Sequence, residues 1–271
     1  MRIRRCFKKL ETEQRKALIP YITVEDPEPG VTVQIMHKLV ENGGDIIELG
    51  FPFSDPVADG PVIARAHERA LSHGVTLNDV ILMVSSFRES NSVTPVVLMG
   101  YLNPIESMGY ELFAQRSCDA GVDGVLVVDL PHEAPGNLSG ILEKRGLDII
   151  NLIAPTTSDE RIRKICNVAS GYLYYVSLKG VTGSAALDIA EVERRVRHIK
   201  KFTTLPISVG FGIRDGDSAA AISKVADGVI VGSVLVSELE KKSEVGNNCQ
   251  VDAVGKILAQ MRSAMDSSCS I

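Results

Sequence analysis

The sequence predicts an α/β protein, a single (β/α)8 barrel with additional short helices. Short runs rich in Val, Ile and Leu recur along the 271 residues, and amphipathic helical segments lie between them. No linker, low-complexity stretch or compositional break interrupts this alternation. An open, doubly wound sheet is the alternative, but eight strand–helix units in one chain of this length favour a closed barrel. We therefore expect residues 1–271 to form one domain.

The expected strands are almost continuously apolar and do not alternate cleanly with polar residues. This pattern is typical of a parallel sheet that is buried on both faces. The strands are expected at residues 18–24, 45–50, 95–100, 124–128, 148–154, 172–177, 206–210 and 228–231.

Helices are expected where apolar residues recur at helical spacing. In residues 31–42 they are followed by Gly43-Gly44, which stops a helix. Thr76 and Ser158 are the expected N-caps of helices 77–88 and 159–168. Further helices are expected at residues 188–202, 234–241 and 251–265, with a polar loop at residues 243–250 and a frayed tail at 266–271.

Composition excludes several classes of protein. A net charge of −5 argues against nucleic-acid binding, which requires clustered excess Lys and Arg. No apolar run approaches the roughly 20 residues of a membrane span, and the basic N-terminal stretch is followed by no apolar signal segment. The cysteines are scattered and odd in number, and the histidines lack metal-binding spacing, so we expect a cytoplasmic protein without a metal site.

Two connections are unusually long, residues 51–61 after the second expected strand and residues 178–186 after the sixth. Both follow a strand, and barrel enzymes place their active sites on that face. Long loops on a compact domain often act as lids.

Glycines cluster directly after the last two expected strands. Gly210-Phe211-Gly212 follows the seventh strand, and Gly232-Ser233 follows the eighth and opens a helix. Backbone N–H groups at glycines and at a helix N-terminus bind anions, and this corner of the barrel is the usual phosphate site. Relief of crowding at strand ends is the alternative, but Gly183 in the neighbouring long loop adds weight to a phosphate site.

Glu48 is the first candidate for chemistry. It lies among Ile and Leu near the end of the second strand. A carboxyl group buried there has a raised pKa, which suits a general acid or base. The alternative is a structural carboxylate paired with a buried cation or a backbone N–H.

Asp59 lies in the loop after the same strand. Like Asp55 and Asp129, it occupies a position where aspartate commonly forms a turn. A buried carboxyl group and a mobile one at the same mouth would nevertheless suit proton transfer during bond cleavage.

Two further residues leave alternatives open. Tyr174 is either core filler or a residue that orients a neighbouring acid, and the pattern does not decide whether Tyr174 or Tyr175 faces inward. Lys179 follows the sixth strand and offers an amine for a Schiff base, as in a class I aldolase, but its glycine-flanked loop would leave it solvated.

Several strings of residues resemble one family, the α subunits of tryptophan synthase. The most specific string is Glu48-Leu49-Gly50-Phe51-Pro52-Phe53-Ser54-Asp55-Pro56-Val57-Ala58-Asp59-Gly60-Pro61. Others begin at Ala17, Met99, Gly180 and Val209, so the resemblance covers nearly the whole chain from about residue 15. It implies a lyase that splits indole-3-glycerol phosphate into indole and glyceraldehyde 3-phosphate in tryptophan biosynthesis.

The resemblance also implies residue roles. Glu48 matches the general acid/base, and Asp59 matches the carboxylate that stabilises the indole nitrogen. The positions implied to line the substrate pocket are Tyr21, Leu126, Tyr174, Thr182 and Phe211. The positions implied to bind phosphate are Gly183, Gly210, Gly212, Gly232 and Ser233.

The implied partner is the tryptophan synthase β subunit, in a complex of two α and two β chains. The β subunit would carry pyridoxal phosphate, and the α subunit would use no cofactor. The loops around Asp55 and Tyr101–Pro104 match the surface that meets β.

The sequence departs from the family pattern at two places, Glu25 before Asp26-Pro27, and Ala64-Arg65. Both are expected to affect loop conformation, affinity or communication with the partner rather than the acid/base pair. Two rival functions are a non-catalytic barrel that only activates a partner and an indole-releasing lyase that needs no β subunit.

Overall fold

A computed structural model describes residues 1–130, 137–177, 188–210, 212–241 and 247–269, and it confirms the barrel. All neighbouring strands pair in parallel, in the order β5-β4-β3-β2-β1-β9-β8-β7-β6. The two ends of this order, β5 and β6, are separated in sequence only by Ile150. They therefore act as one strand, and the sheet closes on itself. The strands are β1 (Ala17–Thr23), β2 (Ile47–Gly50), β3 (Val96–Gly100), β4 (Gly124–Val127), β5 (Asp148–Ile149), β6 (Asn151–Ile153), β7 (Leu173–Val176), β8 (Ile207–Gly210) and β9 (Gly228–Val231).

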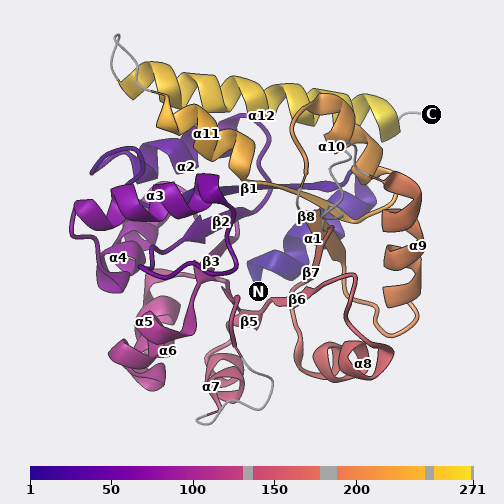
Figure 1. Ribbon diagram of the computed structural model, residues 1–271, viewed down its shortest axis with the longest axis horizontal. Helices are drawn as coiled ribbons and strands as arrows, with labels where there is room; N and C mark the ends of the chain where they lie inside the picture. Colours follow the sequence, from indigo (N-terminus) through magenta and orange to yellow (C-terminus); the bar gives the residue numbers. More distant parts are fainter. Residues whose placement is uncertain (131–136, 178–187, 211, 242–246, 270–271) are drawn as a thin grey trace.

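Helices surround the barrel (Figure 1). The described helices are α1 (Arg2–Thr12), α2 (Thr32–Glu41), α3 (Pro61–Ser72), α4 (Leu77–Arg88), α5 (Leu102–Met108), α6 (Tyr110–Ala120), α7 (Leu138–Lys144), α8 (Asp159–Val168), α9 (Ile189–Ile199), α10 (Gly216–Ser223), α11 (Ser233–Glu240) and α12 (Asn247–Cys269).

The expected caps are present, and one helix is longer than expected. Thr76 forms a capping box with Asp79, and the Ser158 hydroxyl accepts from the Arg161 N–H. The expectation of a polar loop at residues 243–250 and a frayed tail was wrong for the part that is described, because α12 already includes residues 247–250 and continues to Cys269. Helix α12 packs along α2, α10 and α11.

Successive strand residues point alternately to two apolar layers. Leu173 and Tyr175 of β7 face outward and pack under the helices, whereas Tyr172 and Tyr174 face the barrel interior. This alternation follows from the two-residue period of a strand. It settles the open question at β7, because Tyr174 is the inward tyrosine.

Helix α1 covers the N-terminal mouth of the barrel. Ile3 and Leu10 are buried against the interior layer, and the Phe7 ring lies 5.8 Å from the Tyr172 ring. The sequence reading did not anticipate this helix, because its mean composition is strongly polar and only one side is apolar.

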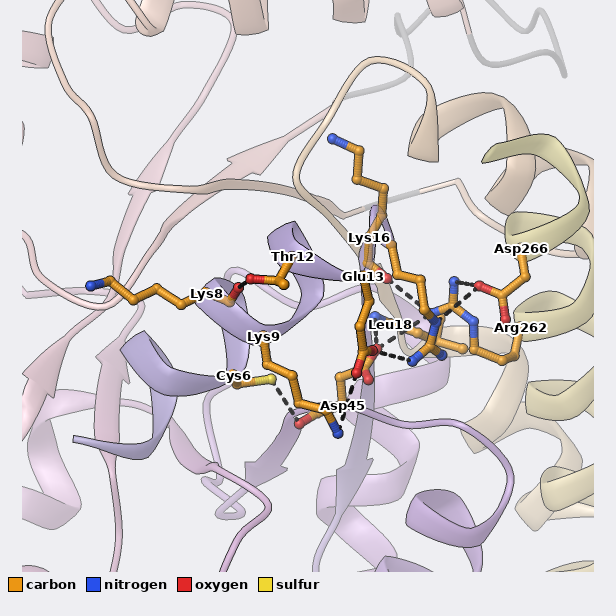
Figure 2. A network of polar contacts seen from close by, with 11 residues as sticks. Cys6, Lys8, Lys9, Thr12, Glu13, Lys16, Leu18, Asp45, Arg262 and Asp266 are labelled. Atoms are coloured by element: carbon orange, nitrogen blue, oxygen red, sulfur yellow. Dashed lines mark hydrogen bonds and ion pairs between the residues drawn. The ribbon is translucent and has the colours of Figure 1, made fainter. Parts of the chain in front are cut away.

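A charge network ties the same mouth to α12 (Figure 2). Arg262 of α12 donates to Asp45 at 3.3 Å and to Asp266 at 2.5 Å. Asp45 also accepts the Leu18 N–H at 2.9 Å, and Arg15 contacts Asp266 at 3.3 Å. The network therefore joins the starts of β1 and β2 to the last helix.

Candidate active site

A cavity of about 260 Å³ opens at the C-terminal ends of the strands. It brings together the predicted site residues Tyr21, Asp59, Tyr174, Gly212, Gly232 and Ser233, and Gly60, Pro61, Val62, Ile63, Met99, Ile213 and Ile230 complete its lining. The lining therefore combines aromatic and apolar side chains with glycines and the start of a helix.

Glu48 lies beneath this cavity and does not line it. Its side chain is fully buried in the barrel interior, where Oε1 accepts the Tyr172 hydroxyl at 2.5 Å. Among the described residues, Oε2 has no hydrogen-bond partner. Burial raises the pKa of Glu48 to about 7, although the Tyr172 hydrogen bond acts in the opposite direction. The carboxyl group therefore has both protonation states available near neutral pH.

Tyr172 was missed by the sequence reading. It precedes β7 and lies two residues before Tyr174, so both side chains point inward. The period of the strand was a signal that could have found it. The negative charge of Glu48 adds to burial in raising the pKa of both tyrosine hydroxyls, so both remain neutral donors.

Asp59 is held by a residue from the next strand connection. The Tyr101 hydroxyl donates to Asp59 Oδ2 at 2.7 Å and accepts the Ala58 N–H at 3.1 Å. Burial raises the pKa of Asp59, and the hydrogen bond from Tyr101 counteracts this rise. Tyr101 is only 1% exposed, so it does not lie on the outer surface, whereas Asp55 and Asn103 are exposed.

The glycine corner, which consists of Gly210, Gly212 and Gly232, lies where the ends of β8 and β9 meet α11. Gly212 has a φ of +80°, a conformation that strains other residues. Gly232 is the N-cap of α11, and no side chain caps that helix start. The exposed Ser233 is the first helical residue, so the backbone N–H groups of this turn face the cavity region.

Two predicted positions lie beside the cavity lining. Gly210 lies under Tyr174, since a Cβ at Gly210 would be 2.2 Å from the tyrosine hydroxyl oxygen. Leu126 is fully buried in the interior layer with Tyr174. Thr182, Gly183, Phe211, Lys179 and the 180–186 connection lie outside the described residues.

Comparisons with known proteins agree across the whole barrel. The family model for "Tryptophan synthase alpha chain" matches residues 7–266. The α chain of Marinobacter nauticus is 55% identical over 266 residues, with 98% of each chain covered. That of Thioalkalivibrio sulfidiphilus is 56% identical over 268 residues, with 98% of this chain and 99% of the relative covered.

A solved structure is also similar over nearly the whole chain. The α subunit of Legionella pneumophila tryptophan synthase superposes with a TM-score of 0.89 at 46% identity, and 98% of each chain is covered. The chain belongs to the tryptophan synthase α-chain family. It is a lyase of tryptophan biosynthesis, and its reaction is the cleavage of indole-3-glycerol phosphate into indole and glyceraldehyde 3-phosphate.

The two departures from the α-chain pattern have structural explanations. Glu25 does not direct its charge into the cavity, because its carboxylate accepts the Gly30 N–H at 2.6 Å and the Thr32 hydroxyl at 3.1 Å. Arg65 forms a bidentate pair with Glu240 at 2.6 and 2.8 Å, which joins α3 to α11. Both departures therefore act on loop and helix placement at the mouth.

The described residues contain no cluster of three or more His, Cys, Asp or Glu side chains arranged to hold a metal. None of the helices in the described part of the chain is both long enough and apolar enough to cross a bilayer.

Proposed function

We propose that Glu48 and Asp59 carry out the cleavage of indole-3-glycerol phosphate in the 260 Å³ cavity. The observation that carries the proposal is the position of Glu48, a buried carboxyl group with a pKa near 7 directly beneath a cavity that also contains Asp59. The indole ring lies against Tyr21, Tyr174 and Leu126, together with Phe211 and Thr182.

The phosphate is held at the glycine corner. Backbone N–H groups of Gly212, Gly232 and Ser233 bind its oxygens, with Gly183, and Gly210 supports this backbone through its packing under Tyr174. Binding energy at the phosphate, remote from the reacting bond, fixes the orientation of the substrate.

The reaction is a retro-aldol cleavage. Protonation of indole C3 places positive charge on the ring nitrogen, and the Asp59 carboxylate stabilises that charge. Removal of the C3′ hydroxyl proton then breaks the C3–C3′ bond, forms the aldehyde of glyceraldehyde 3-phosphate and returns the bonding electrons to indole. Glu48 carries the protons, and a pKa near 7 suits both directions of transfer.

Glu48 changes partner during this cycle. Its carboxyl group is bonded to Tyr172 below the cavity, so its side chain turns upward to reach the substrate. Oε2 has no hydrogen-bond partner among the described residues, so the rotation breaks no described hydrogen bond of this oxygen. Closure of the 180–186 connection would then exclude water.

The chain acts as the α subunit of a complex of two α and two β chains. The exposed Asp55, Val57 and Asn103 follow strand ends at the cavity mouth and form part of the surface for β. Pyridoxal phosphate belongs to the β subunit, and the α chain uses no cofactor. We place the protein in the cytoplasm, as a single domain without nucleic-acid or membrane partners, consistent with its free cysteines Cys6, Cys118, Cys166 and Cys249 and its charge of −5.

The direct test is indole release from indole-3-glycerol phosphate by the purified chain, with and without an added β subunit. Glu48→Gln is expected to lower kcat by about 10³-fold, the upper part of the range for a general acid/base. Glu41→Gln, an exposed change on α2, is the matched control. Near-normal turnover by Glu48→Gln would remove Glu48 from the mechanism.

A further inference from the structure

His67 is a buried titratable residue beside the cavity to which the mechanism assigns no task. It lies on α3, is 2% exposed and contacts three segments that surround Asp59. Its Nδ1 accepts the Phe53 N–H at 3.1 Å, and its Nε2 lies 3.4 Å from the Tyr21 hydroxyl oxygen. The Tyr101 ring meets it edge-on, with 6.4 Å between ring centroids.

The donor at Phe53 determines the tautomer of His67. A backbone N–H can only donate, so Nδ1 is unprotonated, and the proton of the neutral ring lies on Nε2. Nε2–H then donates to the Tyr21 hydroxyl, which lies 3.3 Å from Thr23 Oγ1. A directed chain of hydrogen bonds therefore runs from the loop after β2, through α3, to β1.

This chain connects residues with proposed roles in the reaction. Phe53 lies in the connection that leads to Asp59, and its ring stacks on Tyr101, which holds the Asp59 carboxylate. Tyr21 lines the cavity. His67 is therefore hydrogen-bonded to Phe53, in the connection that leads to Asp59, and to Tyr21, which lines the proposed indole pocket.

Burial of the His67 ring favours the same neutral state. Burial lowers the pKa of His67, whereas the carboxylates of Asp59 and Asp26 partly oppose this. Tyr21 and Tyr101 face it as neutral hydroxyl residues with raised pKa values, and Arg69 is paired with Asp26 at 2.6 Å. Protonation of His67 would add a proton to Nδ1. This N–H would face the Phe53 N–H, and the hydrogen bond between the two residues would be lost.

We propose that neutral His67 is a positioning residue, which fixes the Asp59 loop and the Tyr21 wall by accepting from Phe53 and donating to Tyr21. This inference rests on the proposed roles of Asp59 and Tyr21. It gives His67 no contact with substrate. Its loss therefore changes the geometry of the reacting groups, while the phosphate grip at α11 remains.

Two substitutions separate the two bonds. In His67→Asn, the side-chain oxygen can replace Nδ1 and accept from Phe53. In His67→Gln, the amide reaches the Nε2 position but leaves the Phe53 N–H without its acceptor. We expect Asn to keep kcat within about 3-fold of the parent and Gln to lower it by about 10-fold, with KM for indole-3-glycerol phosphate nearly unchanged, since small misplacement of reacting groups mainly slows the chemical step. The exposed His73→Asn at the end of the same helix is the control.

A second measurement is independent of activity. The ¹⁵N resonances of His67 in the intact chain should show the Nε2–H tautomer from pH 6 to 8, and Asp59→Asn should lower its pKa further by removing an opposing charge. An Nδ1–H tautomer or an imidazolium at pH 7 would overturn the proposal, as would equal kcat values for the Asn and Gln variants. If a variant does not fold, the resonances of the parent chain decide. If the parent itself releases no indole, the proposed function fails, and the tautomer still reports on the positioning geometry.

Discussion

Two acids three residues apart behave differently at the two ends of the barrel. Asp45, before β2, faces the N-terminal mouth and has a cation, Arg262, and the Leu18 N–H as partners. Glu48, within β2, faces the interior below the C-terminal cavity, and its described partner is the neutral Tyr172 hydroxyl. Glu48 is fully buried and Asp45 is partly buried, and of the two only Asp45 has a counter-charge among the described residues.

This difference in counter-charge explains which of the two acids is available for proton transfer. Burial raises the pKa of Asp45 too, but the Leu18 N–H and the charges of Arg262 and Arg15 counteract this rise and stabilise the carboxylate. A carboxyl group held by one hydroxyl keeps a raised pKa and can exchange protons near pH 7. The ionised form of Glu48 lowers the stability of the folded state, because the buried carboxylate has no described counter-charge.

The largest expected effect is a pair of changes in the free energy of unfolding, an increase for Glu48→Gln and a decrease for Asp45→Asn. The pKa of Glu48 rises from 4.5 to about 7 on folding, so the parent chain loses stability as pH rises from 4.5 to 7. Glu48→Gln removes this loss and retains an acceptor for Tyr172. It should stabilise the chain by about 3 kcal/mol above pH 7 and by nothing below pH 4.5. Urea unfolding at pH 4 and pH 8 measures the difference.

Asp45→Asn should destabilise the chain by about 2 kcal/mol at pH 8, because Arg262 is buried and loses a counter-charge. Exposed Glu41→Gln is the control for both variants and should change stability little. Destabilisation by Glu48→Gln at pH 8 would show that the Glu48 charge is compensated and that the two acids are alike.

A second test concerns the close packing at the N-terminal mouth. Gly43 has a φ of +95°, and a Cβ there would be 2.5 Å from Arg262 Cγ. Gly43→Ala combines backbone strain with displacement of Arg262, so we expect a loss of about 2 kcal/mol. Gly74→Ala is the matched control, since Gly74 has a φ of +74° and open space around it, and should cost about 1 kcal/mol. Equal thermal shifts for the two variants would mean that Arg262 packing contributes nothing.

The third test sharpens the description of Glu48. Tyr172→Phe removes a hydrogen bond that lowers the pKa of Glu48, so that pKa should rise above 7. We expect the acid limb of the kcat/KM profile to move to higher pH by about one unit, the equivalent of one hydrogen bond to a charged acceptor. Tyr175→Phe, on the outward face of β7, should leave the profile in place. An unshifted limb in Tyr172→Phe would mean that a group other than Glu48 controls it.

Much of this comparison could be predicted from the sequence, but not all of it. The buried strands and the glycine corner were readable because apolar runs and glycine clusters are local patterns. The sequence analysis also weighed two alternatives for Glu48, a catalytic acid or a paired structural carboxylate. It did not anticipate that Asp45 is the carboxylate with a cationic partner, because that partner, Arg262, lies more than two hundred residues away.

The contacts missed around the site are also long-range. Tyr172 bonds to Glu48 across the barrel, and His67 joins α3 to two other segments. Tyr101 was assigned to the partner surface, but folding buries it against Asp59. Such pairings depend on the closure of the barrel, and no pattern within one segment of the chain contains them.

The smallest expected effect tests whether ion pairs matter equally at the two mouths. At the C-terminal mouth, Arg65 bonds to Glu240, and this bond is the main cause that lowers the pKa of Glu240 to about 2. Arg65 is 47% exposed, however, whereas the Arg262 side chain is 8% exposed, so water and salt screen the Arg65 pair far more. Arg65→Gln should therefore lower stability only slightly, and this small loss should disappear in 1 M salt. Arg262→Gln, measured in parallel, should cost several times more and retain most of its effect in salt, because it leaves Asp45 buried without a cation. Equal losses for the two variants would contradict the view that the barrel is stabilised at its N-terminal mouth and left adjustable at the other.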